Sequence, residues 1–424
     1  MRRHGFQFSR MKGGLLLASA FALIPMIATE AAAVLMDLIP SARIEEGWES
    51  NVFSSSTNEV SSLSTRVTPE LALRFTTTDN VEMRVSGSYE KVWYHDSEAN
   101  EANSETYHFR VNSSGALRLT PTFYMVPSVS YINTTNSFRR TQLVPSGDPV
   151  IPPVSITNYG DTKTETIGGG VRFNYLVTPN VTLGMDGNYS RQRFDTPTDN
   201  AAQTGLTDSS SFGAGASVSY RFSPRTNLGV RLSGSHNTYE DNPITNEDNP
   251  DTDTLSGHIT FGYRFTPTVR LDGGVGVQHI RREGAQGTPE ESETTPSGTL
   301  HLTYTQETVT ATLFGSAVYS GGSGFGEATR QYTAGMSISD RFARDWTWNL
   351  SGAYQISRSA FDTDAEDIRS INGSTGFQYR PWRWATVDLT GNLHRQTSSG
   401  QFGEDLNNYS AHLGFTAANP FHLF

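Results

Sequence analysis

Long stretches of the chain alternate apolar and polar residues with a period of two. In the stretch 63–75 the positions between the apolar residues are polar or small, and the apolar residues are Leu63, Val67, Leu71, Leu73 and Phe75. The same alternation returns in the stretches 81–90, 107–119, 255–265 and 385–394. Because successive residues of a β-strand point to opposite faces, each stretch is predicted to be a strand with one apolar and one polar face.

The predicted strands are longer than those of most globular domains. They run for about 11 to 15 residues, whereas a strand in a soluble domain typically has about 5–6. Long strands suit a tilted crossing of the hydrocarbon layer, with the apolar face turned to lipid and the polar face turned to a wet interior. A soluble β-sandwich or barrel, with its apolar and aromatic side chains turned inward, is the alternative.

Two classes of turn alternate along the chain. The short turns often contain proline, as at 120–122, 178–180, 223–225 and 266–268, and the long connections are rich in Asp, Glu, Asn and Gly, as at 95–104, 142–160, 195–207, 241–253 and 283–294. Short periplasmic turns and long outer loops are typical of transmembrane barrels. The sequence therefore predicts an all-β, antiparallel up-and-down transmembrane barrel of about 18 strands, with 16 as the alternative.

The first residues carry the three parts of a secretory signal. The basic part consists of Arg2, Arg3, Arg10 and Lys12; an apolar stretch covers 13–27, and alanines at 31–33 supply a cleavage site. We therefore expect a signal peptide over 1–33 and an outer-membrane β-barrel over 34–424. The chain ends in Phe424, and a terminal aromatic residue is expected to mark the barrel for the assembly machinery of the outer membrane.

Composition and charge remove several classes of function. The chain has no cysteine, which excludes a lipoprotein anchor, disulfides, attachment of c-type haem and ligation of an iron–sulfur cluster. The net charge of −11 becomes −14 when four basic residues and Glu30 leave with the signal. So acidic a chain is not expected to bind nucleic acid, and no cofactor or metal ion is expected.

Two short motifs stand near the start of the mature chain: Gly47, Glu49, Asn51, Val52 and Phe53, followed by Val67, Thr68, Pro69, Leu71 and Leu73. With these residues the region 41–95 resembles the β-barrel porin type 2 family, whose members are often encoded beside exopolysaccharide or exosortase systems. The resemblance implies an outer-membrane location and a transport role. It implies no catalytic residue.

Arginines are frequent on the polar face of the predicted strands, close to the short turns. They are Arg74, Arg84, Arg118, Arg172, Arg221, Arg231, Arg264, Arg270, Arg341 and Arg380. Fewer acids share their face and level, namely Glu70, Glu82, Asp186, Asp272 and Asp388. Because rings of Arg or Lys favour anions in pores, this excess predicts a basic ring at the periplasmic mouth. The alternative is structural, with each arginine paired to a neighbouring acid.

Three further arginines keep the parity of the outward face but lie beyond the apolar stretch: Arg191, Arg193 and Arg281. They are expected at the level of the lipid headgroups. The planar guanidinium matches phosphate oxygens, so contact with lipopolysaccharide is predicted. The alternative is that these side chains only extend toward water.

The leading interpretation is a porin-like pore or export conduit for polar or anionic solutes, with exopolysaccharide as one candidate. A structural sheath or scaffold is the alternative; its partner would be a polysaccharide-export or secretion component, or a multihaem cytochrome. The third is an outer-membrane hydrolase. The chain contains no HExxH, GxSxG or Walker motif, so no enzymatic activity is expected. His279, which has outward parity and Arg281 near it, is the candidate to test for a hydrolase.

Overall fold

The structure is a computed structural model of the chain, and it describes residues 35–53, 59–76, 82–113, 117–135, 163–195, 208–240, 250–284, 290–320, 329–361, 367–399 and 405–422. The predicted signal peptide, the loop 142–160 and Phe424 lie outside these residues. No helix in the described part of the chain is long and apolar enough to cross a membrane.

Almost all of the described residues are in strands, whose lengths agree with the alternating stretches. They are β1 (Leu35–Glu49), β2 (Ser62–Thr76), β3 (Glu82–Tyr94), β4 (Ser104–Ser113), β5 (Leu117–Thr120), β6 (Phe123–Thr135), β7 (Lys163–Thr178), β8 (Val181–Asp195), β9 (Ser209–Ser223), β10 (Thr226–Tyr239), β11 (Thr252–Arg264), β12 (Val269–Arg282), β13 (Glu291–Thr305), β14 (Val309–Ser320), β15 (Thr329–Ala343), β16 (Trp346–Ser359), β17 (Asp367–Trp382), β18 (Ala385–Ser399), β19 (Leu406–Ala418) and β20 (Phe421–His422). A short 3-10 helix, η1 (Ser97–Ala102), lies between β3 and β4.

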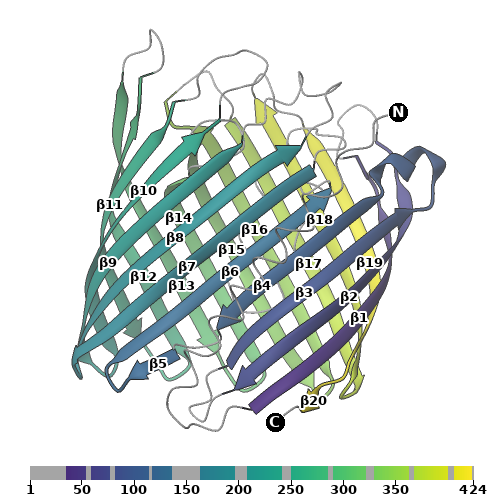
Figure 1. Ribbon diagram of the computed structural model, residues 1–424, viewed down its shortest axis with the longest axis horizontal. Coiled ribbons are helices and arrows are strands. Elements are labelled where there is room, and N and C mark those ends of the chain that lie inside the picture. The colour runs from purple at the N-terminus through teal and green to yellow at the C-terminus, as the bar shows by residue number, and fades with distance from the viewer. Residues whose placement is uncertain are drawn as a thin grey trace, which may run out of the picture.

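The strands close into a barrel, which Figure 1 shows from the side with its strands strongly tilted. Consecutive strands pair antiparallel, and β1 pairs with both β2 and β19, so the sheet has no free edge. β4 and β5 both pair with β6 and are two parts of one strand, and β20 extends β19 along β1. The 20 strand elements of the described residues therefore make 18 barrel strands, which confirms the predicted fold and strand count.

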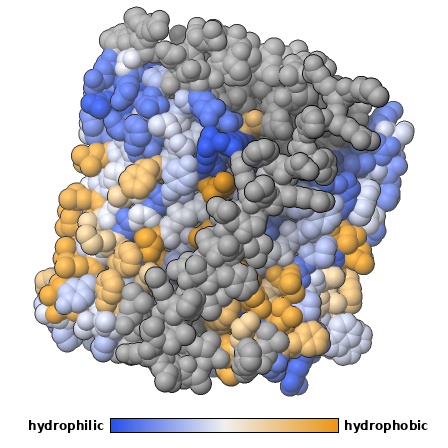
Figure 2. All heavy atoms as spheres, viewed as in Figure 1, coloured by the Kyte–Doolittle hydropathy of each residue, from blue (hydrophilic) through white to orange (hydrophobic). Residues whose placement is uncertain are grey.

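The two faces of the wall differ as the alternation predicted. Large apolar side chains are exposed on the outer face, among them Leu71, Met185, Val230, Leu232, Ile259, Val275, Leu313, Leu389 and Leu413. On the visible side, Figure 2 shows that apolar residues gather over the lower half of the wall, whereas hydrophilic residues gather toward the opposite end. The other face carries polar and charged side chains. On this face polar contacts join strands that are not neighbours, such as Arg43 of β1 and Asp388 of β18, as expected on the concave side of a barrel.

Aromatic side chains form pairs close to the short turns, on the outer face. The ring centroids of Trp346 and Tyr379 are 4.5 Å apart, and those of Tyr263 and Phe265 are 4.8 Å apart. Such aromatic bands lie at the membrane–water interface of transmembrane barrels. The apolar belt and the aromatic band together place the barrel across a membrane, with the short turns on one side and the long connections on the other.

Candidate functional site

A barrel of 18 strands is wide enough to leave an aqueous channel, so the lumen wall is the candidate functional site. The structure describes the side chains of nine of the ten arginines that were predicted to form a basic ring. The tenth, Arg118, belongs to β5, and only its backbone is described. All nine keep lumen parity in their strands.

Four of these arginines are bound to carboxylates. Arg84 pairs with Glu70 at 2.6 Å, and Arg270 pairs with Asp272 of its own strand at 2.7 Å. The other two pairs are Arg74 with Asp37 at 2.5 Å and Arg231 with Asp186 at 2.8 Å. These four arginines are therefore ion-paired, as the alternative to a free basic ring predicted.

Four other arginines share one position in the fold, and we call them the mouth arginines: Arg221, Arg264, Arg341 and Arg380. Each comes at or near the end of a strand, just before a short turn, and its backbone N–H donates to a carbonyl of the preceding short turn at 2.8 Å. The acceptors are the carbonyl oxygens of Asn180, Arg225, Thr308 and Asp345. All four side chains are exposed, and no carboxylate pairs with them among the described residues.

Arg172 is a fifth exposed arginine without an ion pair within the described part of the chain. It lies farther from the short turn than the mouth arginines, within β7, and its register partner in β8 is Asp186. The carboxylate of Asp186 is bound instead to Arg231 of β10. Arg172 and the mouth arginines therefore leave positive charge on the wall from β7 to β17.

The wall around β1 has a different character, which the sequence analysis did not detect. Arg43 donates to Asp388 through both terminal nitrogens of its guanidinium, Nη1 and Nη2, at 2.6 Å, and its Nη2 also donates to Glu45 at 2.6 Å. Glu45 in turn accepts from Arg66 of β2 at 2.5 Å. Alternation in β1 could have placed Arg43 on the lumen face, but its partner Asp388 is 345 residues away in the sequence.

Carboxylates outnumber guanidinium groups in this seam cluster, which consists of Arg43, Glu45, Glu49, Arg66, Glu90 and Asp388. Arg66 lies 4.0 Å from Glu49 and 3.7 Å from Glu90. The hydroxyl of Tyr94 donates to Glu49 at 3.0 Å. With four carboxylates against two arginines, the seam cluster is net negative, whereas the mouth arginines, on β9, β11, β15 and β17, carry positive charge at the level of the short turns.

Glycines let these lumen contacts cross an intervening strand. Arg43 of β1 reaches Asp388 of β18 over Gly414 of β19, where an added Cβ would stand 2.6 Å from the Arg43 Nη2. Arg231 of β10 reaches Asp186 of β8 over Gly215 of β9, where a Cβ would be 2.9 Å from the Arg231 Nη2. A side chain at either glycine would occupy the path of the arginine.

A third crossing concerns the hydrolase alternative. His258 of β11 and Ser297 of β13 meet on the lumen face at 2.8 Å, over Gly276 of β12. In the described residues no carboxylate is bonded to this imidazole, so the third member of a hydrolase triad is not assembled there. His279 bonds to Thr294 at 2.8 Å rather than to a serine.

At the outer end, β14 and β15 lean over the lumen side of β12 and β13. β13 pairs with β14 only from Gly298 to Thr305. Tyr319, although it has outward parity, donates its backbone N–H to the lumen-facing Gln278 at 3.0 Å and packs on Ile280. Arg330 pairs with Glu293 and lies over the Tyr319 ring. These contacts place the ends of β14 and β15 on the lumen side of β12 and β13.

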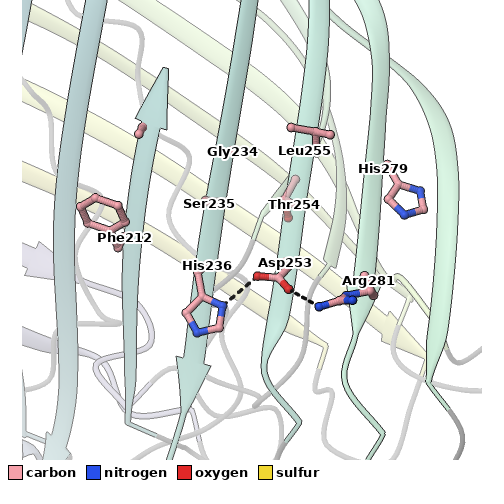
Figure 3. Close-up of a pocket in the computed structure, with 10 residues that line it drawn as sticks. Phe212, Gly234, Ser235, His236, Asp253, Thr254, Leu255, His279 and Arg281 are labelled. Atoms are coloured by element: carbon pink, nitrogen blue, oxygen red, sulfur yellow. Dashed lines mark hydrogen bonds and ion pairs between the residues drawn. The ribbon is translucent and has the colours of Figure 1, made fainter. Parts of the chain in front are cut away.

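The three outward arginines lie in different surroundings. Arg191 pairs with Glu240 at 3.1 Å, and Arg193 faces Glu165 in the ladder. Arg281 pairs with Asp253 at 3.0 Å and lines a groove, drawn in Figure 3. The described residues hold no group of three or more His, Cys, Asp and Glu side chains that could bind a metal ion.

Comparison with known proteins agrees with this architecture. The family model described as Autotransporter beta-domain matches residues 155–288, which is less than half of the chain. No curated protein matches the sequence.

Several solved structures of outer-membrane proteins are similar in arrangement at low sequence identity. OccK2 (OpdF) of Pseudomonas aeruginosa, solved in complex with glucuronate, is 12% identical, and the match covers 92% of this chain and 98% of that one with a TM-score of 0.45. The FrpB iron transporter of Neisseria meningitidis is 8% identical over 90% of this chain and 81% of that one, with a TM-score of 0.46. The siderophore receptor PirA of Acinetobacter baumannii is 9% identical over 90% and 80%, with a TM-score of 0.45.

The closed barrel, its apolar outer face and the matching family model lead to one conclusion about class and location. They do not extend to the more specific β-barrel porin type 2 family. The chain is a β-barrel of the outer membrane.

Proposed function

We propose that the protein is a porin-like channel through which polar anionic solutes pass in preference to cations. The observation that carries the proposal is the set of four mouth arginines, which lie at equivalent positions before the short turns and have no ion pair among the described residues. Unpaired guanidinium groups around an aqueous opening lower the energy of an anion there and raise that of a cation.

The solute class follows from the same chemistry. A guanidinium binds carboxylates and phosphates with two parallel hydrogen bonds, so acidic saccharides fit the mouth better than neutral ones. The resemblance of residues 41–95 to the β-barrel porin type 2 family adds exopolysaccharide to the candidates. A polysaccharide-export partner in the periplasm belongs to this proposal, as does delivery to the membrane through Phe424.

Conductance across a planar bilayer tests the proposal. The refolded mature chain should give a stable conductance, and a salt gradient should give a reversal potential on the anion side. Replacing all four mouth arginines by serine should lower the anion-to-cation permeability ratio by about half or more, most clearly at low salt because the Debye length is about 10 Å at 0.1 M.

The matched control removes the same charge from the outer face. Arg191, Arg281, Arg358 and Arg369 lie on outward positions at the opposite end, and each is bound to a carboxylate. Their replacement by serine should leave the permeability ratio unchanged. A cation-selective channel that does not respond to loss of the mouth arginines would overturn the proposal, and absence of conductance would favour the sheath or scaffold.

A further inference from the structure

A shallow groove of about 530 Å³ lies on the outer face of the barrel, at the end that carries the long connections. Two rows of side chains that follow the strand register from β9 to β12 build it. The row farther from the membrane centre consists of Phe212, His236, Asp253 and Arg281, and the next row consists of Ala214, Gly234, Leu255 and His279. Figure 3 shows His236, Asp253 and Arg281 side by side on adjacent strands, with Gly234, Leu255 and His279 in the next row.

The floor of the groove is apolar and continuous with the lipid-facing belt. Leu255 is 64% exposed and Phe212 is 59% exposed. Gly234 lies between β9 and β11 without a side chain, so the surface is hollowed there. The next row toward the membrane centre contains Leu232 and Val277, both more than half exposed. An acyl chain can therefore lie in the groove without leaving the apolar surface.

The rim carries hydrogen-bond donors that one carboxylate holds in place. Asp253 accepts from the His236 Nδ1 at 2.8 Å and from the Arg281 Nη2 at 3.0 Å. The imidazole of His279 is fixed by Thr294 through its Nδ1 at 2.8 Å, which leaves its Nε2 available. The remaining N–H groups of Arg281 and the Nε2 of His279 are left for a ligand at this end of the groove, whereas the Nε2 of His236 lies 3.7 Å from Asp251.

The charges around the rim restrict the headgroup that fits. Besides Asp253, the carboxylates of Glu290 and Asp251 lie 3.8 Å from Arg281 and 3.7 Å from His236. A bare phosphate would meet three carboxylates and one guanidinium, so the rim would repel it. A phosphate that arrives with divalent cations suits both sets, because the guanidinium of Arg281 and the imidazole of His279 donate to phosphate oxygens and the carboxylates face the cation.

From these contacts we infer that the groove binds one lipopolysaccharide molecule of the outer leaflet. A phosphate of its headgroup lies against Arg281 and His279, and one acyl chain crosses Gly234 toward Leu232. The position settles the choice of lipid, because the long connections of such barrels face outward from the cell. Of the three arginines predicted to contact lipopolysaccharide, this assigns the role to Arg281.

Native mass spectrometry of the refolded mature chain, titrated with rough-type lipopolysaccharide and Mg²⁺ in detergent, measures the binding. The wild-type barrel should bind one molecule, and the double variant Arg281→Gln/His279→Gln should weaken binding about tenfold or more, because charge-assisted contacts to phosphate are lost. Chelation of Mg²⁺ should also weaken it.

Two further variants separate the groove from a general effect of charge. Gly234→Leu keeps the charge and fills the floor; a Cβ there has ordinary contacts, 3.5 Å to the carbonyl of Thr254 and 3.9 Å to Leu255, so the barrel should still fold. It should weaken binding to a similar extent. Arg369→Gln removes an outward arginine that is likewise paired with an aspartate, at 3.0 Å, but lies outside the groove, and it should have no effect.

Wild-type affinity in both Gly234→Leu and Arg281→Gln/His279→Gln would overturn the assignment. So would equal binding of phosphatidylglycerol, since the site would then take any anionic lipid. The measurement does not depend on conductance, so its result is independent of the proposed channel function.

Discussion

The seam cluster allows a quantitative prediction about barrel stability. Replacing Arg43 with methionine keeps most of the side-chain volume and removes the guanidinium that joins β1 to β18. Asp388 then loses both of its short contacts, each 2.6 Å long, and its side chain is only 11% exposed. Glu45 keeps Arg66 at 2.5 Å and is affected less.

The magnitude follows from the number of lost contacts and the exposure of the groups. A hydrogen bond to a charged group contributes about 1.5–3 kcal/mol, and a buried charge that loses its partner costs about 3–5 kcal/mol. Arg43 is 32% exposed, so water reaches one side of the pair and reduces these values. We therefore expect Arg43→Met to lower the free energy of unfolding by about 2–3 kcal/mol.

Urea titration of the barrel in lipid vesicles, followed by tryptophan fluorescence, measures this change. Adding Asp388→Asn to the Arg43 variant should recover part of the loss, because the unpaired carboxylate is then gone. Arg270→Met is the control: its pair with Asp272 is 52% and 35% exposed, and the loss should stay below about 1 kcal/mol. The reasoning is refuted if Arg43→Met and Arg270→Met unfold at the same urea concentration, or if the Arg43 and Asp388 effects simply add.

Two other variants probe backbone packing and the outer opening. Gly276→Ala should destabilise the barrel by about 1–3 kcal/mol, because its Cβ would meet the backbone carbonyl of Gly257 and the strands must move apart. Gly315→Ala is the control and should be tolerated, because the nearest atom to its Cβ is 3.8 Å away. Equal folded fractions of the two variants on heat-modifiability gels would contradict the expected difference. Arg330→Gln breaks the ion pair with Glu293 that helps hold the ends of β14 and β15 over the lumen. Single-channel conductance should therefore rise, whereas the control Arg369→Gln should leave the conductance unchanged. Unaltered conductance in both variants would show that the position of these strand ends does not limit the opening.

The features that depend on neighbouring residues in the sequence were predictable. Alternation is a local property, so the stretch around Leu71 already defined which face meets lipid, and turn length defined which end is which. Strand alternation placed the four mouth arginines on the lumen face. In the structure the backbone N–H of each donates to a carbonyl of the preceding short turn.

Features that depend on lateral register were not predictable from one sequence. Arg43 meets Asp388 only because the first and last strands pair with a particular offset and Gly414 leaves the space open. For the same reason the sequence could not separate Arg231, which finds Asp186 two strands away, from Arg172, which does not. The groove beside Arg281 requires the alignment of four strands, and no short segment contains it.

The repeated position of the mouth arginines has a consequence for how such a pore could change in size. Each of these arginines belongs to one hairpin and its turn. Duplication of that hairpin would therefore add two strands to the barrel and one arginine to its mouth at the same time. Two strands would join 18 and one mouth arginine would join four, so a wider descendant would carry a slightly higher density of positive charge along its edge. Selectivity could in this way be inherited through changes in diameter without any new residue having to arise.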